Sequence, residues 1–149
     1  MNTIDGDIIK KALAGEFDVI IHGCNCFCTM GAGLAKGIKD AFPKAYEADC
    51  ATTKGDKEKL GTCTFAECSI AGGTVTIVNA YTQYNYGRGR VQTDYEAIRQ
   101  CLEWAVEKFR GKRIGLPKIG SGLGGGDWNI IQKIIEEEMS GENVTVVQY

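Results

Sequence analysis

The fold is decided by one stretch of the sequence, Leu116-Pro117-Lys118-Ile119-Gly120-Ser121-Gly122-Leu123-Gly124-Gly125-Gly126-Asp127-Trp128. It starts as an apolar strand, and five glycines then fall within residues 120–126. Glycine tolerates positive φ and lets a ligand approach the main chain, so such a loop can turn several N–H groups toward one anion. Asp127 ends the loop and can cap a following helix. The stretch therefore predicts a strand, an anion-binding loop and a helix, in that order.

A second glycine loop, Met30-Gly31-Ala32-Gly33-Leu34, lies early in the chain after a buried apolar run at 19–21. Two loops that can each hold a phosphate indicate a ligand with a diphosphate. Neither loop has the G-x-G-x-x-G pattern or the Lys-Ser/Thr of a P-loop, which argues against a kinase or a P-loop ATPase. For either loop alone, the alternative is a flexible turn between a strand and a helix.

Helices and strands alternate along most of the chain. Strands are expected at 19–21, 61–70, 74–78, 114–116 and 143–148, and a tight turn at 71–73 makes one hairpin. Helices are expected at 7–13, around Leu34 to Phe42, from a capping box at Thr93, and from Asp127; Pro43 should end or bend the second. This pattern predicts a single α/β domain over 1–149, a three-layer α/β/α sandwich with a mixed, mostly parallel central sheet. Ligands of such sheets bind beyond the carboxyl ends of the strands.

The composition excludes several classes of protein. A net charge of −2 over 149 residues leaves no broad basic face for nonspecific nucleic-acid binding. No apolar run approaches the roughly 20 residues that span a bilayer, so no membrane association is expected. The N-terminus lacks the pattern of a signal peptide. Seven cysteines, an odd number without an export signal, favour reduced thiols and a cytoplasmic, intracellular protein.

Three of the cysteines, Cys24, Cys26 and Cys28, alternate along the sequence. They are either a metal clip or, in a strand, thiols that pack on one face. The chain has one histidine and no Cys-x-x-Cys pair, which favours packing. We therefore expect neither a metal site nor a cofactor.

Several polar residues follow the predicted strands. Asn25 can contact a sugar hydroxyl or stabilise a turn, and His22 is either an acid or base or a hydrogen-bonded residue at a strand end. Asp127 is either a helix cap or a carboxylate that orients a water molecule. The loop 81–88 holds three tyrosines and Arg88; it either borders a sugar, base and phosphate or is simply exposed.

The chain resembles the macrodomain family over almost its full length. Four segments carry the resemblance in a specific order: 6–9, 18–25, 30–35 and 116–128. Within the family it is most similar to the branch of the ADP-ribose 1″-phosphate phosphatases and the terminal ADP-ribose protein glycohydrolase. The Asn85-Tyr86-Gly87-Arg88 loop and the Gly-Gly-Asp-Trp ending resemble microbial and viral phosphatase-like members.

The resemblance implies that the ligand is ADP-ribose or its 1″-phosphate. Asp7 would accept from the adenine amino group, and Asn25 would face the distal ribose. Tyr149 would lie near the base. The full set of binding residues that it implies is Asp7, Ile8, Asn25, Met30, Gly31, Ala32, Gly33, Leu34, Ile119, Gly120, Ser121, Gly122, Leu123, Gly124 and Tyr149.

The sequence departs from two catalytic patterns of the family. Macrodomains that act on modified acidic side chains carry an Asp in the helix after the first loop, where this chain has Ala35. The glycohydrolase branch has a Lys after the central strand and an Asp after the Gly-Leu of the second loop. Here the first region holds Tyr86-Gly87-Arg88, and the second position is Gly124. The nearest remaining carboxylate is Asp127.

We therefore expect catalysis by Asp127, which would activate a water molecule at the 1″-phosphate with His22 and Asn25 as helpers. The predicted function is a phosphatase that converts ADP-ribose 1″-phosphate to ADP-ribose and phosphate. The alternatives are a non-catalytic ADP-ribose-binding module and a hydrolase that removes ADP-ribose from modified protein or nucleic acid. The chain is expected to be a monomer.

Overall fold

A computed structural model of the chain describes residues 1–87 and 91–149. Its described strands form one six-stranded sheet in the order β1-β6-β5-β2-β4-β3. All neighbouring strands are parallel except β3 and β4, which form the predicted hairpin. The strands are β1 (Asn2–Asp5), β2 (Val19–Cys24), β3 (Cys63–Ile70), β4 (Gly73–Tyr81), β5 (Ile114–Leu116) and β6 (Val144–Gln148).

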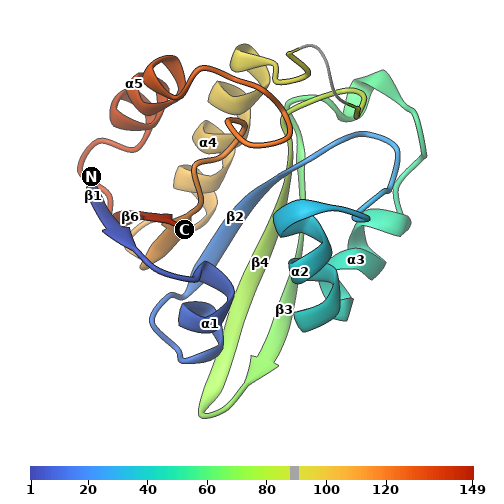
Figure 1. The fold of residues 1–149 in the computed structure, drawn as a ribbon. Helices are drawn as coiled ribbons and strands as arrows, with labels where there is room; N and C mark the ends of the chain where they lie inside the picture. Colours follow the sequence, from blue (N-terminus) through green and yellow to red (C-terminus); the bar gives the residue numbers. More distant parts are fainter. Residues whose placement is uncertain (88–90) are drawn as a thin grey trace.

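Helices cover both faces of the sheet (Figure 1). One face carries α1 (Ile8–Leu13), α2 (Gly33–Ala41) and α3 (Pro43–Cys50), and the other carries α4 (Tyr95–Lys108) and α5 (Trp128–Glu138). A short 3₁₀ helix, η1 (Lys57–Lys59), precedes β3. The predicted three-layer α/β/α sandwich with a mixed, mostly parallel sheet is confirmed.

Strand β2 lies inside the sheet and is apolar on both faces. Val19 and Ile21 pack in the core under α4 and α5, whereas Ile20 packs in the core under α1 to α3. A strand that is covered on both sides has no solvent face to hold polar residues. This explains the continuous apolar run in the sequence and places the end of β2 in the interior of the molecule.

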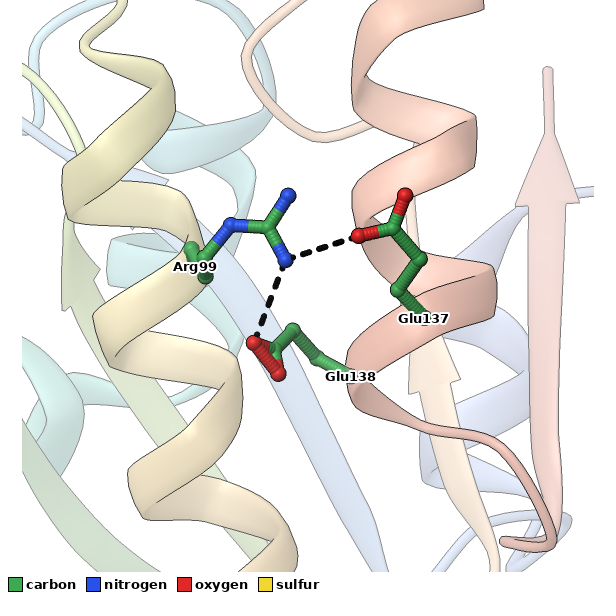
Figure 2. A network of polar contacts seen from close by, with 3 residues as sticks. All are labelled: Arg99, Glu137 and Glu138. Atoms are coloured by element: carbon green, nitrogen blue, oxygen red, sulfur yellow. Dashed lines mark hydrogen bonds and ion pairs between the residues drawn. The ribbon is translucent and has the colours of Figure 1, made fainter.

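Helices α4 and α5 also meet through charged side chains at the surface (Figure 2). The Arg99 guanidinium donates to Glu137 at 3.0 Å and to Glu138 at 3.2 Å, and these carboxylates raise its pKa. Exposed ion pairs of this kind contribute little to stability. In the described part of the chain, no helix is both long and apolar enough to cross a membrane.

Three elements were not predicted from the sequence, and one helix start was placed wrongly. β1, α3 and η1 were missed; Pro43, expected to end α2, is also the first residue of α3. The N-cap of α4 is Asp94, whose side chain accepts from the Ala97 N–H at 3.0 Å. The expected cap, Thr93, instead donates its hydroxyl proton to the carbonyl of Gly120 at 2.6 Å.

The three alternating cysteines do not share the face of one strand. β2 ends at Cys24, and Cys26 and Cys28 lie in the loop that follows. Cys26 is fully buried and its pKa is raised to about 11, mainly because burial disfavours the thiolate. Packing of protonated thiols therefore holds for Cys24 and Cys26, although they do not share a strand.

Candidate functional site

A cleft of about 750 Å³ opens at the carboxyl ends of β2, β4 and β5. Both glycine loops border it, as the rule for open α/β sheets predicts. The described lining consists of His22, Gly23, Cys24, Asn25, Thr29, Gly31, Ala32, Gly33, Leu34, Ala35, Thr82, Gln83, Tyr86, Gly87, Pro117, Lys118, Ile119, Gly120, Gly122, Leu123 and Gly124.

The second glycine loop is folded by bonds between its own main-chain groups. The Ser121 N–H donates to the Lys118 carbonyl at 3.1 Å, and the Gly126 N–H donates to Gly120 at 2.8 Å. Gly120 has φ of 76°, a left-handed conformation that favours glycine. Among the described residues, no protein acceptor binds the N–H groups of Gly120 and of residues 122–124. This loop therefore keeps four donors available for a ligand.

The first glycine loop leads into α2 without a side-chain cap. Its N-cap is Ala32, whereas α1, α4 and α5 are each capped by an aspartate. The first N–H groups of a helix carry partial positive charge and need acceptors. Residues 31–34 all border the cleft, so an anion there can serve as the missing cap.

The two loops come together at Leu123 and Gly33. A Cβ atom built on Gly33 would lie 3.2 Å from Cδ1 of Leu123, so the leucine packs closely over the glycine. Leu123 is nevertheless 54% exposed. An apolar side chain thus joins the two sets of N–H donors at the mouth of the cleft.

His22 borders the cleft as a buried, neutral side chain. Its Nε2 lies 2.7 Å from Oδ1 of Asn79, and Cys24 Sγ lies 3.7 Å from the same nitrogen. Burial lowers the pKa of His22 to about 4, against the smaller raising effect of the Asn79 bond. The imidazole therefore has no second proton to give at neutral pH, and of the two interpretations the hydrogen-bonded residue fits better.

Asn25 both stabilises a turn and borders the cleft. Its Oδ1 accepts from the Phe27 N–H at 2.8 Å, and its Nδ2 donates to Thr29 Oγ1 at 2.7 Å and to the Thr29 carbonyl at 3.3 Å. Both amide protons are used by these contacts. The oxygen has a second lone pair, so Asn25 can still accept from one ligand hydroxyl.

Asp127, the expected catalytic carboxylate, does not border the cleft. It is exposed, and its Oδ1 accepts from the Asn129 N–H at 2.9 Å as the N-cap of α5. The described lining contains no Asp or Glu, and Lys118 is its only formally charged side chain at neutral pH. The structure therefore does not bring Asp127 together with His22 and Asn25.

Five other expected binding residues lie outside the lining. Asp7 caps α1 by accepting from the N–H groups of Ile9 and Lys10 at 3.0 and 3.2 Å, and Ile8 is buried beside it. Tyr149 is fully exposed at the end of β6. β1 and β6 are parallel to β5, so these residues lie on the same sheet edge, beyond the cleft.

The remaining two, Met30 and Ser121, belong to the glycine loops but are not part of the cleft lining. Met30 is buried against Cys24, Cys26 and Tyr81. Ser121 donates its hydroxyl proton to the Lys118 carbonyl at 2.7 Å. Met30 thus anchors the first glycine loop and Ser121 the second, and neighbouring residues of each loop line the cleft.

Two residues after β4, Thr82 and Gln83, border the cleft but were not singled out from the sequence. Thr82 is fully buried, and its Oγ1 has no hydrogen-bond partner among the described residues. Gln83 faces the second glycine loop, because a Cβ atom on Gly124 would lie 2.9 Å from its Oε1. Their position after a strand was the available signal; Arg88, chosen instead from that loop, lies outside the described residues.

A buried polar cluster supports the loop that precedes the first glycine loop. The Tyr81 hydroxyl donates to Asp49 Oδ1 at 2.8 Å, and Lys59 donates to the Cys26 carbonyl at 3.0 Å. Burial raises the pKa values of Tyr81 and Asp49. In the described residues, no group of three His, Cys, Asp or Glu side chains is placed to hold a metal ion.

The chain is an α/β/α protein with a cleft at the carboxyl ends of its parallel strands. Two glycine loops with unused N–H donors border this cleft. The chain belongs to the Macro domain family, whose sequence model matches residues 21–135. The family resemblance predicted from the four sequence segments is thus confirmed.

Similar proteins cover the whole chain. An uncharacterized 17.5 kDa protein in the tk-vs intergenic region of Enterobacteria phage T4 is 37% identical over 151 aligned positions, and the match covers 98% of this chain and 94% of that protein. An ADP-ribose 1″-phosphate phosphatase of Aspergillus oryzae is 25% identical, over 97% of this chain and 91% of that protein. A DNA ADP-ribosyl glycohydrolase of Thermus aquaticus is 24% identical, over 92% of this chain and 38% of that protein.

Solved structures have the same fold. The structure of Thermosipho africanus DarTG in complex with ADP-ribose matches with a TM-score of 0.75. It is 19% identical, and the match covers 100% of this chain and 42% of that chain. At this identity the likeness establishes the fold alone.

Proposed function

We propose that the cleft binds ADP-ribose and that the chain hydrolyses ADP-ribose 1″-phosphate to ADP-ribose and phosphate. The observation that carries the proposal is the pair of unused N–H sets, residues 31–34 and Gly120 with residues 122–124, on one cleft of about 750 Å³. A volume of this size accommodates a nucleotide-sized ligand. Two anion sites on one cleft match a ligand with a diphosphate and a further phosphate.

The arrangement suggests how the ligand lies. The diphosphate accepts from residues 120–124, and the distal ribose lies toward Asn25 and the uncapped start of α2. The adenine extends along the sheet edge toward Asp7 and Tyr149, which follow β1 and β6. The name of the Aspergillus oryzae relative, and the ADP-ribose in the Thermosipho africanus structure, support this choice of ligand.

Hydrolysis of the 1″-phosphate requires little acid–base catalysis from side chains. A water molecule adds its oxygen to phosphorus, the bond to the ribose oxygen breaks, and a proton from water ends on that oxygen. Phosphoryl transfer of this kind relies mainly on positioning and on stabilising charge on the phosphoryl oxygens. N–H donors at the start of α2 can supply that stabilisation, and Asn25 can orient the sugar. No step requires a carboxylate in the described lining.

The test is calorimetric titration with ADP-ribose followed by phosphate release from ADP-ribose 1″-phosphate. Asn25→Ala is expected to lose turnover strongly, because the ribose loses an acceptor and the turn loses three bonds. Asn129→Ala is a matched control, since Asn129 is exposed on α5 and outside the cleft. Absence of ADP-ribose binding by the wild-type protein would refute the proposal.

A second candidate is a binding module without chemistry. The observation that favours it is the absence of Asp and Glu from the described lining. It predicts ADP-ribose binding with no phosphate release above a heat-inactivated control. Removal of ADP-ribose from protein or nucleic acid is less well supported, because Tyr86-Gly87-Arg88 and Gly124 stand where the resemblance implies Lys and Asp.

A further inference from the structure

The segment that precedes α4 lies against the second glycine loop. The N–H groups of Gln92 and Thr93 both donate to the Gly124 carbonyl, at 2.8 and 3.2 Å. The Thr93 hydroxyl donates to the Gly120 carbonyl at 2.6 Å. Three hydrogen bonds therefore fix the carbonyls of Gly120 and Gly124, the two ends of the stretch that holds the four unused N–H groups.

The Thr93 side chain also occupies the space that three glycines leave. A Cβ atom on Gly120 or Gly126 would lie 3.0 or 3.1 Å from Thr93 Cγ2, and one on Gly124 would overlap Thr93 Oγ1. A Cβ atom on Gly122 would meet nothing within 4 Å. Three of the loop glycines thus make room for Thr93, which is itself 7% exposed and does not border the cleft.

The same segment is tied to the end of β4. The Asp94 N–H donates to the Thr82 carbonyl at 2.8 Å, and Gln83 pairs with Thr93 in an antiparallel bridge. Asp94 in turn caps α4. The start of α4 is therefore a rigid link between two borders of the cleft, the glycine loop and residues 82–83.

We propose that Thr93 is a positioning residue for the anion-binding loop. Its hydroxyl and N–H hold the carbonyls of Gly120 and Gly124, so the N–H groups of residues 122–124 keep one arrangement before a ligand arrives. Donors fixed in advance bind more tightly because less ordering remains to be done on binding. This inference rests on the proposed function for the identity of the ligand.

The experiment compares Thr93→Val, which removes the hydroxyl at nearly constant shape, with Thr93→Ser, which keeps it. Thr62→Val is the matched control, because the Thr62 hydroxyl makes a bond of 2.6 Å to the Lys59 carbonyl outside the cleft. Four quantities are measured: the Kd for ADP-ribose, kcat and KM for ADP-ribose 1″-phosphate, and amide hydrogen exchange of the loop without ligand. The exchange is followed at Ser121, Gly125 and Gly126, whose N–H groups are hydrogen-bonded within the loop.

Thr93→Val should raise the Kd about tenfold, the usual effect of one buried hydrogen bond. It should raise KM with little change in kcat, because binding is lost equally in the ground and transition states. Loop exchange should accelerate in Thr93→Val, while Thr93→Ser and Thr62→Val stay close to wild type.

Unchanged loop exchange in Thr93→Val would overturn the inference, and so would faster exchange with an unchanged Kd. A Kd raised equally in Thr93→Ser would also overturn it, because the hydroxyl would then be irrelevant. Failure of the proposed function looks different: the wild-type protein itself would not bind ADP-ribose, while the exchange comparison still reports whether Thr93 holds the loop.

Discussion

His22 should make the protein lose stability as the pH falls from 6.5 to 4. Its pKa is about 4 in the folded state, compared with an ordinary value of 6.5. Between these values the unfolded chain binds a proton that the folded chain does not. The free energy of unfolding therefore decreases as the pH is lowered. A difference of about 2.5 pKa units corresponds to roughly 3 kcal/mol, nearly all of it lost by pH 4.

The assay is urea unfolding followed by tryptophan fluorescence at several pH values, with His22→Gln as the comparison. Glutamine keeps an N–H donor for Asn79 and does not titrate. His22 is the only histidine, so no other imidazole contributes. Asp49, whose pKa burial raises, acts in the opposite direction and is common to both proteins. Parallel pH profiles for wild type and His22→Gln would refute the buried, neutral histidine.

Three further predictions concern the cleft and its loops. Gly124→Ala should cost about 1–3 kcal/mol, because the new Cβ overlaps Thr93 and has no room, whereas Gly122→Ala should be neutral; equal shifts in thermal unfolding would contradict this. Asp127→Ala should lower stability by about 1 kcal/mol through the lost cap and leave phosphate release intact; lost turnover would return Asp127 to the chemistry. ADP-ribose affinity should be flat from pH 6 to 8 in calorimetry, since His22 is already neutral there; a steep loss would indicate a charged imidazole.

The elements that the sequence predicted well are those whose signal is local. The apolar run of β2 and the glycine loop after β5 follow from short-range chemistry, and both lie where expected. β1 was missed because it has only four residues and its partner β6 lies at the other end of the chain. α3 was missed because Pro43 can end one helix and begin the next, and only packing decides that it does both.

The site was predicted less well than the fold, since its side chains depend on long-range contacts. Thr93 and Asp94 both suit a helix cap, and the choice between them is made by the Gly120 carbonyl, 27 residues away. Asp127 was chosen for its place in the sequence near the phosphate loop. Its carboxylate instead accepts from the Asn129 N–H as the cap of α5, the other role that the sequence allowed.

The charge distribution explains how a cleft without a nucleotide fingerprint can select a phosphorylated ligand. The chain carries a net charge of −2, and Lys118 is the only formally charged side chain in the described lining. In the described lining, the groups available to an anion are therefore directed N–H donors and one cation. Such bonds act only when the donors are correctly spaced, so affinity depends on the shape of the two loops rather than on total charge. Through the N–H donors that it positions, Thr93 is therefore proposed to influence binding although it does not border the cleft.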